Sequence, residues 1–140
     1  MPLVRERLAT GQTVRYLPFR GVSMLPMLRQ GKDAVEVGPV TLPLRKYDLP
    51  VYQYPSGKYV MHRIVKVEPD HYVCLGDNTY EYERIRPEQI LAVVTAFRRD
   101  KKRIGVNDAG YRIYCRIWVA LYPLRRFLMR AKRWLRRHMK

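Results

Sequence analysis

The stretch Tyr59-Val60-Met61-His62-Arg63-Ile64-Val65-Lys66-Val67 has the clearest β pattern in the chain. Successive side chains of a strand point to opposite faces, so His62 and Arg63 are expected on opposite faces of one strand. Residues 68–70 then predict a turn and residues 71–75 a returning strand. Together the two runs predict an antiparallel hairpin.

Outward from this hairpin, further short strands alternate with turn residues. Strands are predicted over residues 13–19, 34–37, 49–54 and 90–97. Many short strands, without internal repeats, predict a mainly β domain built on a folded-over or barrel-like sheet.

Charge divides the chain into two unequal parts. Residues 1–97 have 13 Lys+Arg against 10 Asp+Glu, whereas residues 98–140 have 15 against 2. A β domain is therefore expected over 1–97 and a basic tail over 98–140. In the tail, apolar residues recur at steps of three and four, which predicts an amphipathic helix that Pro123 kinks or splits.

Three roles fit this basic helix: packing against the β domain, binding an anionic membrane surface, or binding nucleic acid. Trp118, Phe127 and Trp134 at the apolar face or its flanks favour the membrane surface over nucleic acid. The sequence shows neither a secretory signal nor a run of about 18 apolar residues. A cytoplasmic location is therefore expected, peripheral on the inner membrane surface.

Cysteine and histidine spacing predicts neither a disulfide nor a metal site. Cys74 and Cys115 lie in different segments, fit a reducing compartment and are expected to stay free. Four residues, His62, His71, Cys74 and Asp77, could together suggest a metal site, but Cys-x₂-Cys and His-x₃-His spacings are absent. No metal and no other cofactor is predicted.

A serine lies in a stiff bend, Arg20-Gly21-Val22-Ser23-Met24-Leu25-Pro26-Met27-Leu28. Gly21 takes positive φ at no steric cost, and Pro26 fixes its own φ and biases Leu25 away from helix. The bend is expected to present the Ser23 hydroxyl in one direction.

Three segments of the chain follow one another in an order that is also found in a known protein family. They are this serine bend, Met61-His62-Arg63-Ile64-Val65, and Cys74-Leu75-Gly76-Asp77-Asn78. Together, over residues 10–97, they resemble the signal peptidase I superfamily, whose nucleophile box reads Ser-Met-x-Pro. The His-Arg pair resembles its Ser/His branch, of the SipW-like and endoplasmic-reticulum type. The resemblance implies a signal-peptidase or LexA-like fold and a serine endopeptidase that cleaves a leader or pro-peptide.

The resemblance also implies roles for individual residues. Ser23 would be the nucleophile and His62 the general base. The acid that orients His62 is left open between Asp77 and Glu83, with Glu81 as the neighbour of Glu83. Glu83 matches the family position by spacing, and Asp77 has the alternative of supporting the turn structurally.

The environment of the serine is expected to bind substrate. The backbone N–H of Ser23 is the simplest oxyanion donor, because Gly21 replaces a hydroxyl side chain that relatives of the Ser/Lys branch carry. Met24 and Pro26, with the neighbouring apolar residues of the bend, are expected to line a substrate groove.

The chain departs from the family pattern in two places. Tyr47 replaces the glycine of the Gly-Asp pattern that opens the strand over residues 49–54. Before Ser23 the sequence also lacks the membrane helix that anchors most signal peptidases. A non-catalytic binding module with a peptidase-like fold therefore remains the alternative, although residues 1–20 are too short for a repressor's helix-turn-helix domain.

Overall fold

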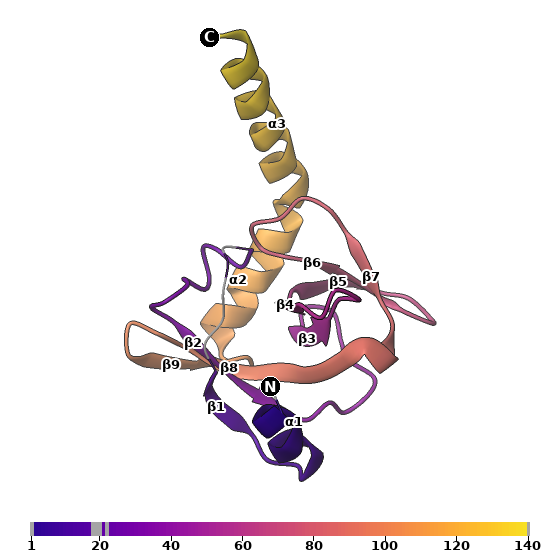
Figure 1. Ribbon diagram of the computed structural model, residues 1–140. Helices are drawn as coiled ribbons and strands as arrows, with labels where there is room; N and C mark the ends of the chain where they lie inside the picture. The colour runs from indigo at the N-terminus through magenta and orange to yellow at the C-terminus, as the bar shows by residue number, and fades with distance from the viewer. Residues whose placement is uncertain (1, 18–20, 22, 140) are drawn as a thin grey trace.

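In the computed structural model of Figure 1, the described residues form two antiparallel β-sheets, with a short helix near the start of the chain and two longer helices near its end. The structure describes residues 2–17, 21 and 23–139. The prediction of a mainly β protein with C-terminal helices is confirmed.

The larger sheet is built around one long strand, β8. Its strands run in the order β1 (Val14–Leu17), β2 (Ala34–Gly38), β8 (Ile90–Arg99), β3 (Pro50–Gln53) and β4 (Tyr59–Met61), and β9 (Lys102–Gly105) also pairs with β8. All of these pairs are antiparallel. β1 is an edge strand of this sheet, and the part of the strand predicted over residues 13–19 that follows Leu17 lies outside the described residues.

The smaller sheet consists of β5 (Arg63–Val67), β6 (Tyr72–Leu75) and β7 (Glu83–Ile85) within the described residues. The β5–β6 pair is the predicted hairpin, which is confirmed. The single strand predicted over residues 59–67 is wrong, because the chain leaves one sheet after Met61 and enters the other at Arg63. A continuous β pattern does not show where a chain changes sheets.

The sheet also extends beyond the predicted domain boundary at residue 98. β8 continues to Arg99, and a tight turn at Asp100 and Lys101, with φ values of 52° and 66°, returns the chain into β9. The ladder between β8 and β9 uses backbone groups, so the charged side chains that suggested a boundary do not prevent pairing. The 3₁₀ turn η1 (Pro87–Gln89) leads into β8.

Helices occupy both ends of the chain. α1 (Pro2–Ala9) precedes the sheet, and α2 (Ala109–Ala120) and α3 (Tyr122–His138) follow it. The predicted split at Pro123 is confirmed, since this proline lies in the first turn of α3, where a missing N–H costs no hydrogen bond. Among the described helices, none combines the length and apolar character needed to cross a membrane.

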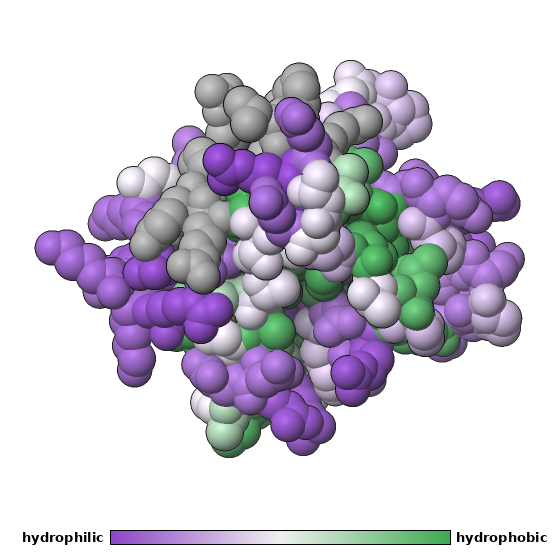
Figure 2. Space-filling model, turned by 90° about the horizontal axis from the view of Figure 1, so that it is seen from below, coloured by the Kyte–Doolittle hydropathy of each residue, from purple (hydrophilic) through white to green (hydrophobic). Residues whose placement is uncertain are grey.

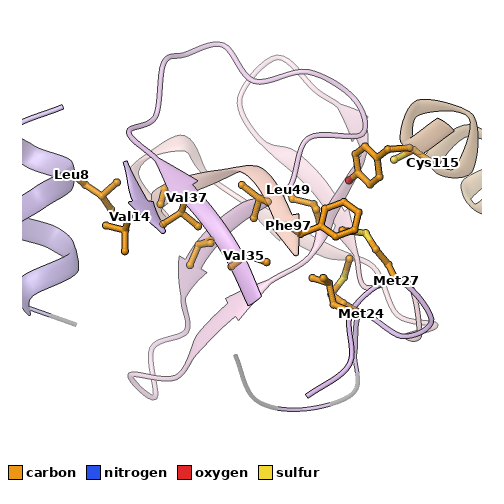
Figure 3. Packing of buried hydrophobic residues seen from close by; sticks show 14 residues of the cluster. Leu8, Val14, Met24, Met27, Val35, Val37, Leu49, Phe97 and Cys115 are labelled. Atoms are coloured by element: carbon orange, nitrogen blue, oxygen red, sulfur yellow. The ribbon is translucent and has the colours of Figure 1, made fainter. Parts of the chain in front are cut away.

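The larger hydrophobic core lies between the big sheet, the serine bend and α2. Figure 3 shows Met24 and Met27 of the bend close to Phe97 of β8, with Cys115 of α2 nearby. α2 is therefore part of the domain and not an appended tail. A second core contains Tyr52 of β3, Ile64, Cys74 and Ile85 of the small sheet, and Ile90. Both cysteines are buried and free, as expected.

The two terminal helices differ in their relation to this body. α2 lies against the sheets, whereas α3 continues upward and away from them (Figure 1). Seen from the opposite end, the body has a mixed surface in which hydrophilic side chains surround smaller hydrophobic areas (Figure 2).

Candidate active site

His62 lies at the junction of the two sheets. It is the single residue between β4 and β5, and its side chain is only 8% exposed. Met61 before it pairs with Val51, and Arg63 after it pairs with Leu75. Strand pairing on both sides therefore fixes the backbone from which the imidazole projects.

The carboxylate of Glu83 contacts the His62 imidazole. Glu83 Oε1 lies 2.5 Å from His62 Nδ1. The hydroxyl of Tyr52 donates to the same oxygen at 2.8 Å and lies 3.2 Å from Nδ1, and the hydroxyl of Tyr54 donates to Oε2. Glu83 comes from β7 of the small sheet and Tyr52 from β3 of the large one, so this cluster links both sheets.

The surroundings favour an ionised Glu83 beside a neutral His62. Burial alone would raise the pKa of Glu83, but hydrogen bonds from Tyr54, Tyr52 and His62 outweigh it and lower the pKa below its ordinary value. Burial lowers the pKa of His62, and the opposing charge of Glu83 offsets this only in part. Burial also raises the pKa of Tyr52, whose hydroxyl stays protonated and able to donate.

This arrangement fixes the tautomer of the imidazole. A carboxylate only accepts hydrogen bonds, so the proton of the neutral ring belongs on Nδ1, where it donates to Glu83. The lone pair is then on Nε2. An imidazole oriented in this way is suited to accept a proton at Nε2.

Ser23 and His62 meet at Gly76. The N–H of Asn78 donates to the Ser23 carbonyl at 2.8 Å. The Ser23 carbonyl oxygen and His62 Cδ2 both lie within 3.0 Å of the point that a Cβ on residue 76 would occupy. They are therefore on the same side of Gly76, and Cδ2 is the ring carbon bonded to Nε2. The backbone of Ser23 and the Cδ2 edge of the imidazole therefore both approach Gly76, which has no side chain.

Asp77 does not contact His62 and instead pairs with Arg63. Two charge-assisted hydrogen bonds of 2.9 Å join the guanidinium to the carboxylate, and both side chains are almost fully buried. Burial alone would lower the pKa of Arg63, but the Asp77 carboxylate outweighs it and raises this pKa. Of the two candidate acids, Glu83 contacts the imidazole, and Asp77 pairs with Arg63, a structural role different from the turn support expected as its alternative.

Arg63 uses its remaining donors to bind α2 and the serine bend. Nη1 donates to the hydroxyl of Tyr111 at 2.7 Å and to Cys115 Sγ at 2.9 Å, and Nη2 donates to Met27 Sδ at 3.0 Å. Arg63 points away from the cluster around Glu83, as the alternation of side chains predicted.

The predicted oxyanion and groove residues have different environments. Gly21 is exposed at a φ of 92°, as expected, and its N–H donates to the Gln30 side chain. Met24 is only 3% exposed, because its side chain packs into the larger hydrophobic core. The expectation that Met24 lines an open substrate groove is therefore wrong. Pro26 is exposed and lines a cavity of about 420 Å³ together with Phe97.

Tyr47 has a left-handed backbone conformation. Its φ is 80°, in the left-handed region that glycine occupies without strain. Its N–H donates to the Ile64 carbonyl at 2.8 Å, and its carbonyl accepts from Arg63 at 3.2 Å. Residue 47 therefore keeps a glycine-type conformation although it is a tyrosine.

The C-terminal helices hold the loop between Gly76 and Glu83. Trp118 Nε1 and Arg125 Nη1 both donate to the Asp77 carbonyl, at 2.8 and 3.0 Å, and the Tyr122 hydroxyl donates to the Tyr80 carbonyl at 2.7 Å. The guanidinium of Arg125 also stacks over the Trp118 ring, 4.4 Å from its centroid. Sequence analysis did not predict this clamp, because its partners lie about 40 positions apart.

Tyr52 and Tyr54 were also missed as site residues. Both occur at alternate positions in the predicted strand over 49–54, so the pattern does place them on one face. The pattern does not say which face meets Glu83, since β7 was not predicted.

Metal binding has no support among the described side chains, where no group of three or more His, Cys, Asp and Glu could hold an ion. Comparison of the chain with protein-family models, curated proteins and solved structures finds no match in any of the three.

Proposed function

We propose that this protein is a serine endopeptidase of the signal-peptidase-like type that cleaves a leader or pro-peptide. Ser23 is the nucleophile, His62 the general base, and Glu83 the acid that orients His62. The observation that carries the proposal is the placement of groups around His62: the Ser23 backbone and His62 Cδ2 both approach Gly76, and the half-buried Glu83 carboxylate contacts His62 Nδ1.

The chemistry follows from the tautomer. As Ser23 Oγ attacks the substrate carbonyl carbon, His62 Nε2 takes its proton, and Glu83 stabilises the resulting imidazolium. The same proton passes to the leaving amine when the peptide bond breaks. A water molecule then repeats the sequence on the acyl-enzyme, with His62 again as base. The Ser23 backbone N–H serves as an oxyanion donor in this scheme.

Two further features support the family resemblance. The positive φ of Tyr47 explains why the family pattern has glycine at that position. The two residues of the His-Arg pair also have different partners. His62 contacts Glu83, whereas Arg63 forms a buried ion pair with Asp77 in the core. A serine and a histidine placed together by chance would not predict either feature.

The chain contains two serines, Ser23 and Ser56, which makes the decisive experiment simple. A fluorophosphonate probe should label the parent protein and the Ser56→Ala variant equally. The Ser23→Ala variant should lose labelling and peptide cleavage while its unfolding midpoint stays near that of the parent. Labelling that persists in Ser23→Ala would remove Ser23 as the nucleophile.

A non-catalytic binding module is the second candidate, and the strongly basic C-terminal helix favours it. On this hypothesis the peptidase-like site is a relic and the helix provides the function. The parent would then resist fluorophosphonate and cleave no peptide in a library, and DNA affinity would fall steeply with salt.

A further inference from the structure

The apolar side of the C-terminal helices is exposed along most of its length. α2 and α3 are separated only by Leu121, and hydrogen bonds from Leu121 N to the Ile117 carbonyl and from Arg125 N to the Leu121 carbonyl, both 2.9 Å, carry the helical pattern across the junction. Helical rows therefore run from one helix into the other. Figure 1 shows that α3 extends beyond the β sheets.

One row of large apolar side chains follows this joint helix at helical spacing. We call it the apolar stripe: Ile113, Ile117, Leu121, Leu124, Phe127, Leu128, Trp134 and Leu135. Phe127, Leu128 and Trp134 are 66%, 55% and 57% exposed. Exposed apolar side chains that are contiguous on one face indicate an interaction surface.

The stripe is not the side by which the helices dock on the domain. Docking uses Tyr111, Cys115 and Tyr122, which are buried. A helix turns about 100° per residue, so these positions are centred almost half a turn from the stripe. The stripe can therefore meet a partner while α2 remains packed on the sheets.

Basic side chains cover the rest of α3. From residue 109 to the end of the chain there are ten Lys and Arg and no Asp or Glu. Arg126, Arg130, Arg133 and Arg137 lie opposite the stripe, and Lys132 lies at its flank. Any partner that covers the stripe therefore meets strong positive charge along the whole of α3.

We propose that the apolar stripe and its flanking cations bind the surface of an anionic lipid bilayer, with α3 lying in the plane of the interface. Acyl chains would cover Phe127, Leu128 and Trp134, and anionic headgroups would meet the basic residues. Nucleic acid would match the charge but would leave the stripe exposed. A second copy of the chain would cover the stripe but would bring two strongly cationic helices together.

This surface is independent of the proposed peptidase chemistry, but it bears on where that chemistry occurs. The first turn of α3 and the end of α2 hold the loop that carries Asp77 and Tyr80. A helix that rests on a bilayer would therefore hold the candidate site close to the membrane.

The test is co-sedimentation of the full chain with vesicles. Vesicles of phosphatidylcholine containing phosphatidylglycerol should sediment the protein, and vesicles of phosphatidylcholine alone should bind at least about tenfold less. Raising the salt concentration should weaken binding to the anionic vesicles.

Variants separate the apolar contribution from the charge. Phe127→Ser, Leu128→Ser and Trp134→Ser combined should weaken binding to anionic vesicles by about tenfold or more. The matched control, Leu42→Ser with Val67→Ser, removes exposed apolar side chains from the β domain and should bind like the parent. A second variant, Arg130→Gln, Arg133→Gln and Arg137→Gln combined, should lose the preference for anionic lipid.

Three results would overturn the proposal. Equal binding of the serine variant and the parent would mean that charge alone is responsible. Absence of vesicle binding together with tight binding of duplex DNA would assign the surface to nucleic acid. Absence of vesicle binding together with self-association that the serine variant abolishes, measured by sedimentation velocity, would assign the stripe to a second copy of the chain.

Discussion

At the scale of single residues, the candidate site depends on which nitrogen of His62 carries the proton. Glu83 holds that proton on Nδ1, and Tyr52 and Tyr54 keep Glu83 ionised by donating to it. A carboxylate with these donors is a poor proton acceptor, so it orients the ring and does not compete with it for the serine proton.

Replacing Glu83 by glutamine should therefore impair cleavage strongly without unfolding the protein. An amide that presents its N–H₂ group to Nδ1 would favour the wrong tautomer, and we expect kcat to fall by about 10² to 10⁴-fold. The matched control is Glu81→Gln, two residues away on the exposed loop, which should retain activity. A Glu83→Gln variant as active as the control would show that Glu83 does not orient His62.

The pH dependence of kcat/KM should report the low pKa of His62. Cleavage needs the neutral imidazole, so activity falls as His62 gains a proton at acidic pH. Because burial lowers this pKa, the midpoint of the acid limb should lie below the ordinary value of about 6.5. The residual activity of Glu83→Gln should show a still lower midpoint, since the charge that raises the His62 pKa is gone. A midpoint above 6.5 in the parent would contradict the buried, neutral ring.

Gly76 should tolerate no side chain. A Cβ there would lie 2.7 Å from the Ser23 carbonyl oxygen, closer than real Cβ atoms approach, and 3.0 Å from His62 Cδ2, which is tighter than most real contacts. Gly76→Ala should therefore reduce kcat/KM by about tenfold or more, because a shift of 1 Å in a reacting group is costly. Gly110→Ala, at an open position in α2, is the matched control and should leave both activity and unfolding midpoint unchanged or slightly raised. An unchanged rate for Gly76→Ala would show that the serine bend and the imidazole need not be this close.

Much of this site could be predicted from residue types and their order. Ser23, His62, Asp77 and Glu83 were all named from the sequence, but the sequence left two acids open. The choice between Asp77 and Glu83 depends on which of them the fold places beside His62. Glu83 reaches His62 from β7, which pairs with β6, and β7 is a three-residue strand with no clear sequence pattern. Tertiary pairing supplies that information, and local spacing does not.

At the scale of elements, Arg63 joins β5, the serine bend and α2. Its guanidinium binds Asp77 on the loop after β6, Met27 in the bend, and Tyr111 and Cys115 on α2. A buried cation with this many partners leaves several unpaired groups when it is removed.

Arg63→Met should therefore be severely destabilising. It leaves the buried Asp77 carboxylate without its cationic partner, and we expect a loss of about 3–5 kcal/mol in the free energy of unfolding, measured by urea denaturation. Asp77→Asn combined with Arg63→Met should cost less than the two single changes added together. Lys66→Met, in the same strand but on an exposed ion pair, is the control and should change stability by at most about 1 kcal/mol. A mild effect of Arg63→Met would show that α2 docks without this ion pair.

The elements themselves were predictable to different degrees. The predicted strands match β2, β3, β6 and β8 closely because their apolar patterns are bounded by turn residues. The change of sheet at His62 was not predictable, since a strand that crosses between sheets keeps its alternation. β9 was missed because Lys102 and Arg103 are polar residues of an edge strand, which needs no apolar face.

At the scale of the whole molecule, the body and α3 contribute differently to stability. The residues of α3 that hold the body, Tyr122 and Arg125, belong to its first turn. From Phe127 onward the large apolar side chains are largely exposed.

A chain that ends after Arg126 should therefore keep its fold. We expect the thermal midpoint to stay within about 2–4 °C of that of the full chain, because little buried surface is lost. Fluorophosphonate labelling of Ser23 should also persist, whereas ending the chain after Leu121 should reduce both. A large drop in the midpoint for the chain ending at Arg126 would show that the outer part of α3 supports the body.

His62 lies between the two sheets, with Tyr52 on one and Glu83 on the other. The proposed catalytic activity should therefore be lost when the two sheets separate, even if each sheet stays folded. The three strands β5, β6 and β7 can separate from the larger sheet only by pulling Glu83 away from Tyr52. Such a subglobal fluctuation has its own free energy, below that of complete unfolding. On gentle heating, hydrolysis should therefore cease while most amide protons of the large sheet still resist exchange with deuterium.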